Sequence, residues 1–295
     1  MCFVPLILHL LRAQVKRKTV AMPDCLWYRG RMKRIWALVF LALGLPLQAA
    51  TLWSAGVTRD AGWFDANKSH QRGAEGDDLM CWAVVASNLV AWWQQQNSAL
   101  VPAGTPAGDA VWLTYLKSFD NEGSDPDQGL RWWFSGQYEQ RQPGGGLKCA
   151  ALKQTASGGY YRQSAVVLEN WFYNGRGAGV TARHLTEVLY RGFARGDAFW
   201  MGASCRKPDG SRFMHSITVW GVDYEMNADG APCITAIYMC DSDDRVRCLH
   251  RIPVRVHEEK LVFDCAQHPM YGRLGLVTLD VYGGLRSAAP QADSR

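Results

Sequence analysis

Hydrophobic residues recur at three- and four-residue intervals in residues 79–96, LMCWAVVASNLVAWWQQQ. The positions at these intervals are Leu79, Trp82, Val85, Ala86, Leu89 and Trp93. This spacing predicts an α-helix with one face that can be buried. Asp77 and Asp78 come just before it, and carboxylates suit a helix cap or first turn because they meet unpaired N–H groups there. We therefore expect the helix to begin directly after these two acids.

The pattern changes toward the C-terminus. Residues 181–193 predict a second helix, and the segments that follow are rich in β-branched and aromatic residues, as strands are. These segments are 215–224, 233–240, 251–256 and 274–282, with turn residues at 227–230 between the first two. Helices followed by consecutive strands predict an α+β fold with an antiparallel sheet. We expect surface loops at 104–108, 121–129 and 142–146, which are rich in small and polar residues.

The N-terminal segment has the pattern of an export signal. An apolar run at 35–47 follows Lys33 and Arg34 and precedes Ala49 and Ala50. Thirteen helical residues are too short to cross a bilayer core of about 30 Å. Residues 32–50 are therefore predicted to be a signal peptide, and residues 1–31 either an upstream segment or a sign that translation starts at Met32. We expect a secreted or periplasmic protein without stable membrane insertion, with one domain at 51–285 and a flexible tail at 286–295.

Net charge supports this division of the chain. The 295 residues contain 32 Lys and Arg against 27 Asp and Glu, which gives +5. Eight basic residues and one acid lie in the first 50 positions, so 24 basic and 26 acidic residues follow them. The basic excess belongs to the leader, and we expect no nucleic-acid partner.

Cys81 lies in the first turn or so of the predicted helix at 79–96. A helix N-terminus and a nearby imidazolium can lower a thiol pKa from about 8.5 to about 3.5–7.5, which suits a nucleophile. The alternative is a buried structural cysteine or one half of a disulfide.

His215 lies 134 residues after Cys81, at the start of a predicted strand. This separation is within the roughly 130–150 residues between the Cys and His of papain-type enzymes. Asp241 and Asp243 follow the next predicted strand, in YMCDSDD, and either could orient the imidazole. A hydrogen-bonded strand histidine and a solvated acidic loop are the alternatives.

These segments resemble a known family. The strings GWFDANKSH and GDDLMCWAVVASNLVAWW, with HSITVWGVDY and AIYMCDSD, are similar to the immunoglobulin-degrading cysteine endopeptidases of the IdeS/Mac type. The resemblance covers about residues 60–285 and implies a papain-like cysteine protease fold, in which the helix carrying the nucleophile packs against the antiparallel sheet.

The resemblance also implies a role for each site residue. Cys81 corresponds to the nucleophile, His215 to the general base and acid, and Asp241 to the residue that orients His215. Asp243 corresponds to a supporting carboxylate, and Lys68 to a lysine that completes the oxyanion hole beside the N–H of the nucleophile. The chain is about three residues longer than the family pattern between Lys68 and Cys81.

The activity that the resemblance implies is hydrolysis of peptide bonds through a thioester, with an immunoglobulin heavy chain near its hinge as substrate. Two alternatives stay open. One is a glutamine deamidase or acyl transferase that uses the same thiol chemistry, and the other is a non-catalytic immune-binding protein. No cofactor is expected, and the oligomeric state is not predicted.

Six further cysteines follow the predicted leader: Cys149, Cys205, Cys233, Cys240, Cys248 and Cys265. In an exported protein, this even number predicts up to three disulfides with no readable pairing. Cysteines and histidines also gather near the C-terminus, at Cys248, His250, His257, Cys265 and His268. Their spacing matches no compact zinc pattern, so no metal is expected.

Overall fold

The computed structural model describes residues 50–139, 149–153, 158–162, 172–176, 180–207, 210–264, 271–274 and 276–287. All of them belong to one compact unit. The predicted upstream segment at 1–31, the signal peptide except Ala50, the loop at 142–146 and most of the tail lie outside these residues. Among the described helices, none is long and apolar enough to cross a membrane.

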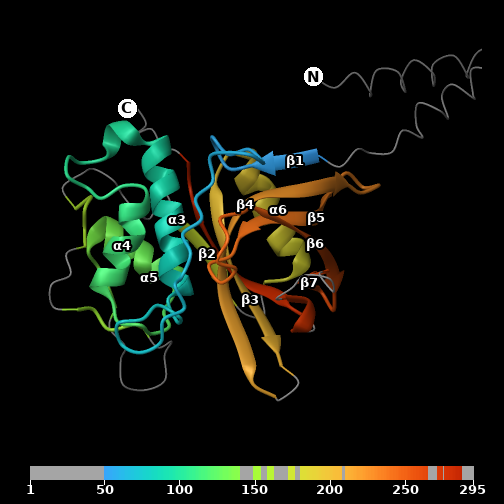
Figure 1. The fold of residues 1–295 in the computed structure, drawn as a ribbon. Helices are drawn as coiled ribbons and strands as arrows, with labels where there is room; N and C mark the ends of the chain where they lie inside the picture. Colours follow the sequence, from blue (N-terminus) through green and yellow to red (C-terminus); the bar gives the residue numbers. More distant parts are fainter. Residues whose placement is uncertain are drawn as a thin grey trace, which may run out of the picture. The chain divides into compact units, whose positions relative to one another are not determined.

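Three helices gather on one side of the fold (Figure 1). They are α3 (Cys81–Gln96), which a short 3₁₀ turn, η1 (Ser98–Leu100), follows, α4 (Asp109–Ser118) and α5 (Pro126–Ser135). Helix α3 packs against α4 and α5 on one side and against strands of the sheet on the other, so it lies between these two helices and the sheet. This position explains why α3 is buried on almost all sides and not on one face alone.

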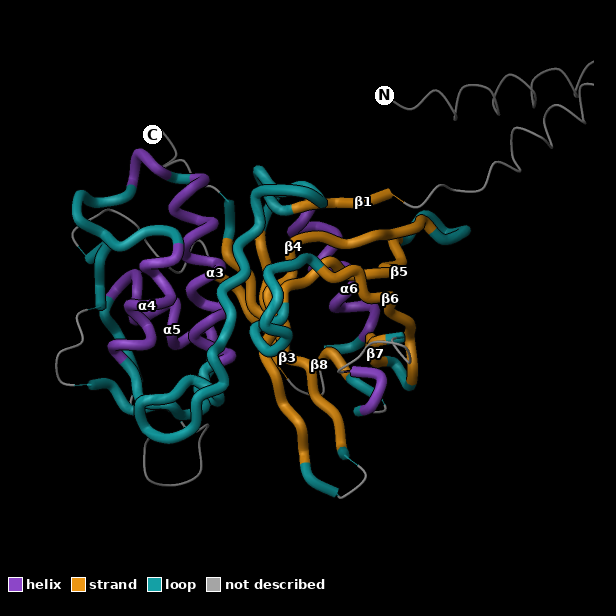
Figure 2. The backbone as a smooth tube through the Cα atoms, viewed as in Figure 1, coloured by secondary structure: helices purple, strands orange, loops and turns teal. Residues whose placement is uncertain are grey.

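The other layer is an eight-stranded antiparallel sheet, drawn as the orange strands of Figure 2. Its strands are β1 (Ala50–Trp53), β2 (Phe172–Arg176), β3 (Ala198–Arg206), β4 (Arg212–Met226), β5 (Pro232–Cys240), β6 (His250–His257), β7 (Lys260–Phe263) and β8 (Thr278–Leu285). The order is β1-β4-β3-β8-β7-β6-β5, with β2 beside β8. Because β4 also pairs with β5, the six strands from β4 to β5 close into a barrel-like ring. Helix α6 (Ala182–Ala194) packs against β1, β3, β4, β5 and β7.

Both faces of the central strands are buried, each against a different cluster. On β3, Ala198 and Trp200 belong to the cluster formed with α3, α4 and α5. The alternate residues Phe199, Met201 and Ala203 belong to the cluster formed with α6. Successive strand residues point to opposite faces, so β3 contributes to both cores. The first cluster is rich in fully buried tryptophans, including Trp82, Trp93, Trp132, Trp133 and Trp220.

Several predicted elements are confirmed. The fold is α+β with an antiparallel sheet. The helix predicted at 181–193 is α6, and the Thr181 side chain accepts a hydrogen bond from the His184 N–H at its start. The turn at 227–230 joins β4 to β5, where the Gly230 N–H donates to the Asn227 carbonyl.

The start of α3 differs from the prediction. The helix begins at Cys81, no side chain caps it, and Leu79 is 54% exposed instead of buried. Asp77 does not cap the helix because its carboxylate accepts hydrogen bonds from the Ser69 and Gln71 N–H groups, which fold the preceding loop. Asp78 hydrogen-bonds to Asn121 instead.

Other boundaries also differ. Strand β4 begins at Arg212, so His215 lies inside it, and the strand predicted at 274–282 begins only at Thr278. The segment 121–129 is not an exposed loop, because Asn121 and Asp125 are buried. Asp125 caps α5 by accepting the Asp127 N–H.

Candidate active site

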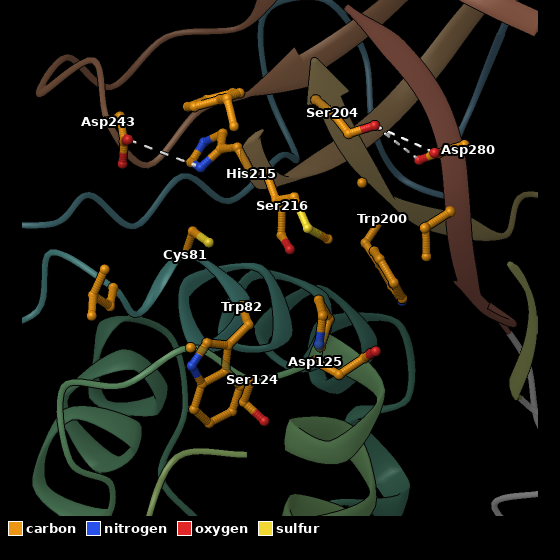
Figure 3. Close-up of a pocket in the computed structure, with 18 of the residues that line it drawn as sticks. Cys81, Trp82, Ser124, Asp125, Trp200, Ser204, His215, Ser216, Asp243 and Asp280 are labelled. Atoms are coloured by element: carbon orange, nitrogen blue, oxygen red, sulfur yellow. Dashed lines mark hydrogen bonds and ion pairs between the residues drawn. The ribbon is translucent and has the colours of Figure 1, made fainter. Parts of the chain in front are cut away.

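A cavity of about 450 Å³ lies where the N-terminal end of α3 faces the sheet. Figure 3 shows Cys81 on its helical side and His215 on its sheet side. Strands β3, β4 and β8 and the start of α5 supply the rest of the wall. Leu79 and Met214 line it too and are 54% and 56% exposed. The site therefore opens to solvent beside apolar side chains.

Cys81 is the first residue of α3. Its N–H has no intrahelical partner, because the first N–H groups of a helix have no carbonyl one turn before them. Burial raises the pKa of the thiol, but a hydrogen bond with His215 and the charges of His215 and Lys68 outweigh burial and lower it. The backbone of Ser216 adds a hydrogen bond that lowers it further.

His215 is 5% exposed on β4. Its Nε2 atom lies 2.7 Å from Asp241 Oδ1. Burial lowers the pKa of the imidazole, yet the charge of Asp241 and the hydrogen bonds to Asp241 and Cys81 raise it well above its usual value. A lowered thiol pKa beside a raised imidazole pKa favours a thiolate–imidazolium pair.

Asp241 follows the last residue of β5 and is fully buried. Its Oδ1 also accepts the Asp243 N–H at 2.9 Å, and its Oδ2 accepts the Tyr271 hydroxyl at 2.7 Å. Burial raises the pKa of this carboxyl, but the charge of His215 and these hydrogen bonds lower it to about 2. Asp241 is thus held ionised beside His215.

Lys68, which is buried, forms an ion pair with the partly exposed Asp243 at the same end of the cavity. Lys68 Nζ lies 2.6 Å from Asp243 Oδ1 and donates to the Asp78 carbonyl at 2.8 Å. Asp243 Oδ2 lies 3.9 Å from His215 Nδ1, which is farther than Asp241 lies from the same ring. The structure thus brings all five predicted site residues together.

Between Lys68 and Cys81 the chain folds into a loop around Asp77, whose carboxylate accepts the Ser69 and Gln71 N–H groups. The Lys68 N–H donates to the Ser242 carbonyl at 3.0 Å, which ties this segment to the loop after β5. Asn88 of α3 adds a second tie, because its side chain accepts the Ala66 N–H and donates to Thr218 of β4.

Sequence reasoning missed two residues that hold the site. The Tyr271 hydroxyl holds Asp241 through a hydrogen bond. Asn121 accepts the Leu79 N–H at 2.8 Å and donates to Asp78, which fixes the backbone just before Cys81. No motif pointed to either residue. Both act on segments that are distant in the sequence, so only the fold reveals their role.

The donor atoms of His215, Asp241 and Asp243 lie within 4.8 Å of one another, which is close enough to hold a metal ion. The Lys68 ammonium already lies against Asp243, and a second cation there would be repelled. This group fits an acid–base role better than a metal site.

The predicted disulfides are not shown by the structure. Cys205, Cys233, Cys240 and Cys248 are free thiols. Cys265 lies outside the described residues.

Residues 49–104, which include Lys68, Cys81 and α3, match the family model described as Mac 1. The chain is also similar to the IgM protease of Streptococcus suis (strain P1/7), with 27% identity over 214 residues. Both comparisons support the Mac family. The aligned region is 62% of this chain but only 18% of the length of that protease.

Proposed function

We propose that this protein is an exported cysteine endopeptidase with a papain-like fold, in which Cys81 is the nucleophile and His215 the general base and acid. The observation that carries the proposal is the hydrogen-bonded series Cys81–His215–Asp241 at the N-terminal end of α3. It combines a thiol of lowered pKa, an imidazole of raised pKa and an ionised carboxylate on the far side of the ring. This is the arrangement that thiol-dependent acyl transfer requires.

The Cys81 thiolate attacks the carbonyl carbon of a peptide bond and forms a tetrahedral oxyanion. The Cys81 N–H, unpaired at the helix start, and the Lys68 ammonium stabilise the negative charge on this oxygen. His215 gives its proton to the leaving amine as the thioester forms. It then takes a proton from water, which attacks the thioester and releases the second product.

Asp241 and Asp243 have different roles in this mechanism. Asp241 is the positioning residue for His215, because it lies 2.7 Å from Nε2 and leaves Nδ1 for the thiol side. Asp243 positions the Lys68 ammonium through their 2.6 Å ion pair. Asp241→Asn is therefore expected to impair thiol activation, whereas Asp243→Asn is expected to impair stabilisation of the oxyanion.

The proposed substrate is an immunoglobulin heavy chain near its hinge. The name of the similar Streptococcus suis protein, an IgM protease, supports this class of substrate. The open cavity with Leu79 and Met214 beside it supports a polypeptide substrate, because exposed apolar side chains can contact an extended chain on both sides of the cleaved bond.

The test is to incubate the protein with purified IgM, IgG and a peptide library, and to identify new termini by mass spectrometry. Cys81→Ala is the inactive variant, and Cys233→Ala, which removes an exposed thiol elsewhere, is its matched control. We expect new backbone termini with wild type and with Cys233→Ala, and none with Cys81→Ala.

Other outcomes separate the alternatives. A mass gain of about one dalton per glutamine without new termini would indicate a deamidase. Retention of immunoglobulin by both wild type and Cys81→Ala, with no covalent change, would indicate a binding protein. Either result would overturn the proposal.

A further inference from the structure

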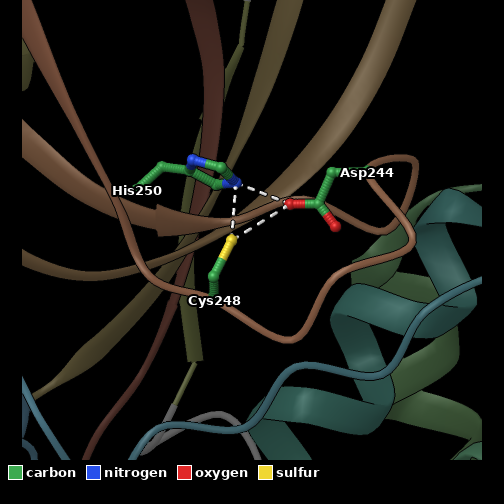
Figure 4. A group of neighbouring side chains, drawn as sticks. All are labelled: Asp244, Cys248 and His250. Atoms are coloured by element: carbon green, nitrogen blue, oxygen red, sulfur yellow. Dashed lines mark hydrogen bonds and ion pairs between the residues drawn. The ribbon is translucent and has the colours of Figure 1, made fainter.

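A second cluster of reactive side chains lies in the loop that follows Asp243. Asp244, Cys248 and His250 turn their polar atoms toward one another (Figure 4). His250 Nε2 lies 2.5 Å from Asp244 Oδ2 and 3.0 Å from Cys248 Sγ, and the sulfur lies 3.5 Å from the same carboxylate oxygen. All three side chains are partly buried.

The polar atoms of this cluster face one common point. The Nε2 atom of His250 faces both the thiol and the carboxylate oxygen, so three possible ligand atoms converge there. The other oxygen of Asp244 is occupied by the Val246 N–H, which aims Oδ2 at this point.

The separations suit a small tetrahedral cation. Zinc bonds of about 2.0–2.3 Å to oxygen, nitrogen and sulfur place the ligand atoms about 3.3–3.6 Å apart. The carboxylate–sulfur distance is already in this range, and the other two need to widen by less than about 1 Å. Thiolate, imidazole and carboxylate together suit zinc, whereas calcium and magnesium prefer oxygen alone.

Asp65 is an independent sign that the surroundings favour a cation. This carboxyl is 7% exposed, its Oδ2 accepts the Cys248 N–H at 2.9 Å, and its Oδ1 has no hydrogen-bond partner among the described residues. Asp65 therefore places a further buried carboxyl group, with one unpaired oxygen, against the backbone of Cys248.

We propose that Asp244, Cys248 and His250 bind one zinc ion, with water in the fourth position. Their loop connects β5 to β6 and also carries Asp241 and Asp243. An ion there would fix the loop from both ends, because Asp244 lies three residues after Asp241 and His250 is the first residue of β6. The proposed peptidase mechanism has no step at this position, and the role proposed for the ion is to hold this loop.

The test measures zinc binding to the full chain after chelator treatment, in the Cys81→Ala background, by equilibrium dialysis and calorimetry. This background removes the active-site thiol, so the result does not depend on the proposed peptidase activity. We expect one zinc per chain, with affinity reduced about a hundredfold or more by Cys248→Ser and by His250→Gln. Cys233→Ser, the matched control at an exposed thiol, is expected to keep the site.

Cobalt(II) provides a second readout, because a thiolate–cobalt charge-transfer band is expected with Cys81→Ala and absent after Cys248→Ser is added. Zinc is also expected to raise the thermal unfolding midpoint of Cys81→Ala without affecting the Cys248→Ser form. Equal binding with and without Cys248→Ser would overturn the proposal. So would the absence of zinc binding by folded protein, with folding checked by circular dichroism.

Discussion

The sharpest prediction concerns Asp241→Asn, which removes one charge and keeps the shape of the side chain. The pKa of Asp241 is about 2 against an ordinary 3.8. This difference corresponds to about 2–3 kcal/mol of net favourable interaction with the ionised carboxylate. The charge of His215 is the largest favourable contribution to it.

Loss of this interaction lowers the pKa of His215, so the imidazolium form is less populated. The imidazolium is the group that lowers the pKa of Cys81. If most of this interaction is lost, the thiolate–imidazolium pair becomes about 10–100 times less populated near pH 6, since about 1.4 kcal/mol is a factor of ten. The rate of Cys81 alkylation by iodoacetamide reports this population directly and needs no substrate. The assay is the alkylation rate from pH 4 to 9, followed on the Cys81 peptide by mass spectrometry.

Asp223→Asn is the matched control for this assay. Asp223 is a buried, ion-paired aspartate on the same strand as His215, and its partner is Arg251. We expect the alkylation profile to move to higher pH by about one to two units in Asp241→Asn and to stay unchanged in Asp223→Asn. An Asp241→Asn profile identical to that of wild type would refute the role of Asp241. A larger shift of the alkylation profile in Asp243→Asn than in Asp241→Asn would indicate that Asp243 orients His215 instead.

Three further predictions follow from the same structure. Cys81→Ala is expected to lower peptide cleavage at least about a thousandfold, measured as kcat/KM, because the members of a catalytic unit fail together. Lys68→Met is expected to lower kcat about 100- to 1,000-fold because it removes a donor to the oxyanion. If the urea midpoint shows that unfolding of the variant accounts for the whole loss of activity, this role is contradicted. The depressed pKa of Asp241 contributes stability that is present above about pH 4 and lost as pH falls through 2, so urea unfolding from pH 5 to pH 2 should show a loss of about 2 kcal/mol that Asp241→Asn lacks.

The residues of the candidate site could be selected from the sequence because their signals are local. Cys81 precedes a helical pattern, and His215 and Asp241 lie in or after strand patterns, so each could be placed on an element. The order of the strands, with the β4–β5 pairing that closes the ring, was not readable because it depends on contacts between distant segments. Tyr271 escaped prediction for the same reason.

Helix α5 shows how packing overrides local preference. Its sequence PDQGLRWWFS contains Gly129 in the interior, and glycine weakens a helix by about 1 kcal/mol relative to alanine. A Cβ at Gly129 would lie 2.9 Å from the Ala86 Cβ and 3.1 Å from the Trp82 ring, so glycine permits the close approach of α5 to α3. The first four residues of α5 belong to the stretch 121–129, which was expected to be a loop because it is rich in small and polar residues. Asp77 was expected to cap α3, but its carboxylate instead accepts hydrogen bonds from N–H groups of the preceding loop.

The proposed nucleophile and its proposed base come from different layers of the fold. Cys81 belongs to the helical layer, whereas His215 and Asp241 belong to the sheet. The lowered pKa of the thiol therefore exists only while the two layers are docked. The reactivity of the Cys81 thiol at low pH therefore measures whether the two layers are docked. In a denaturant titration, loss of this reactivity reports separation of the layers even where each layer keeps its secondary structure.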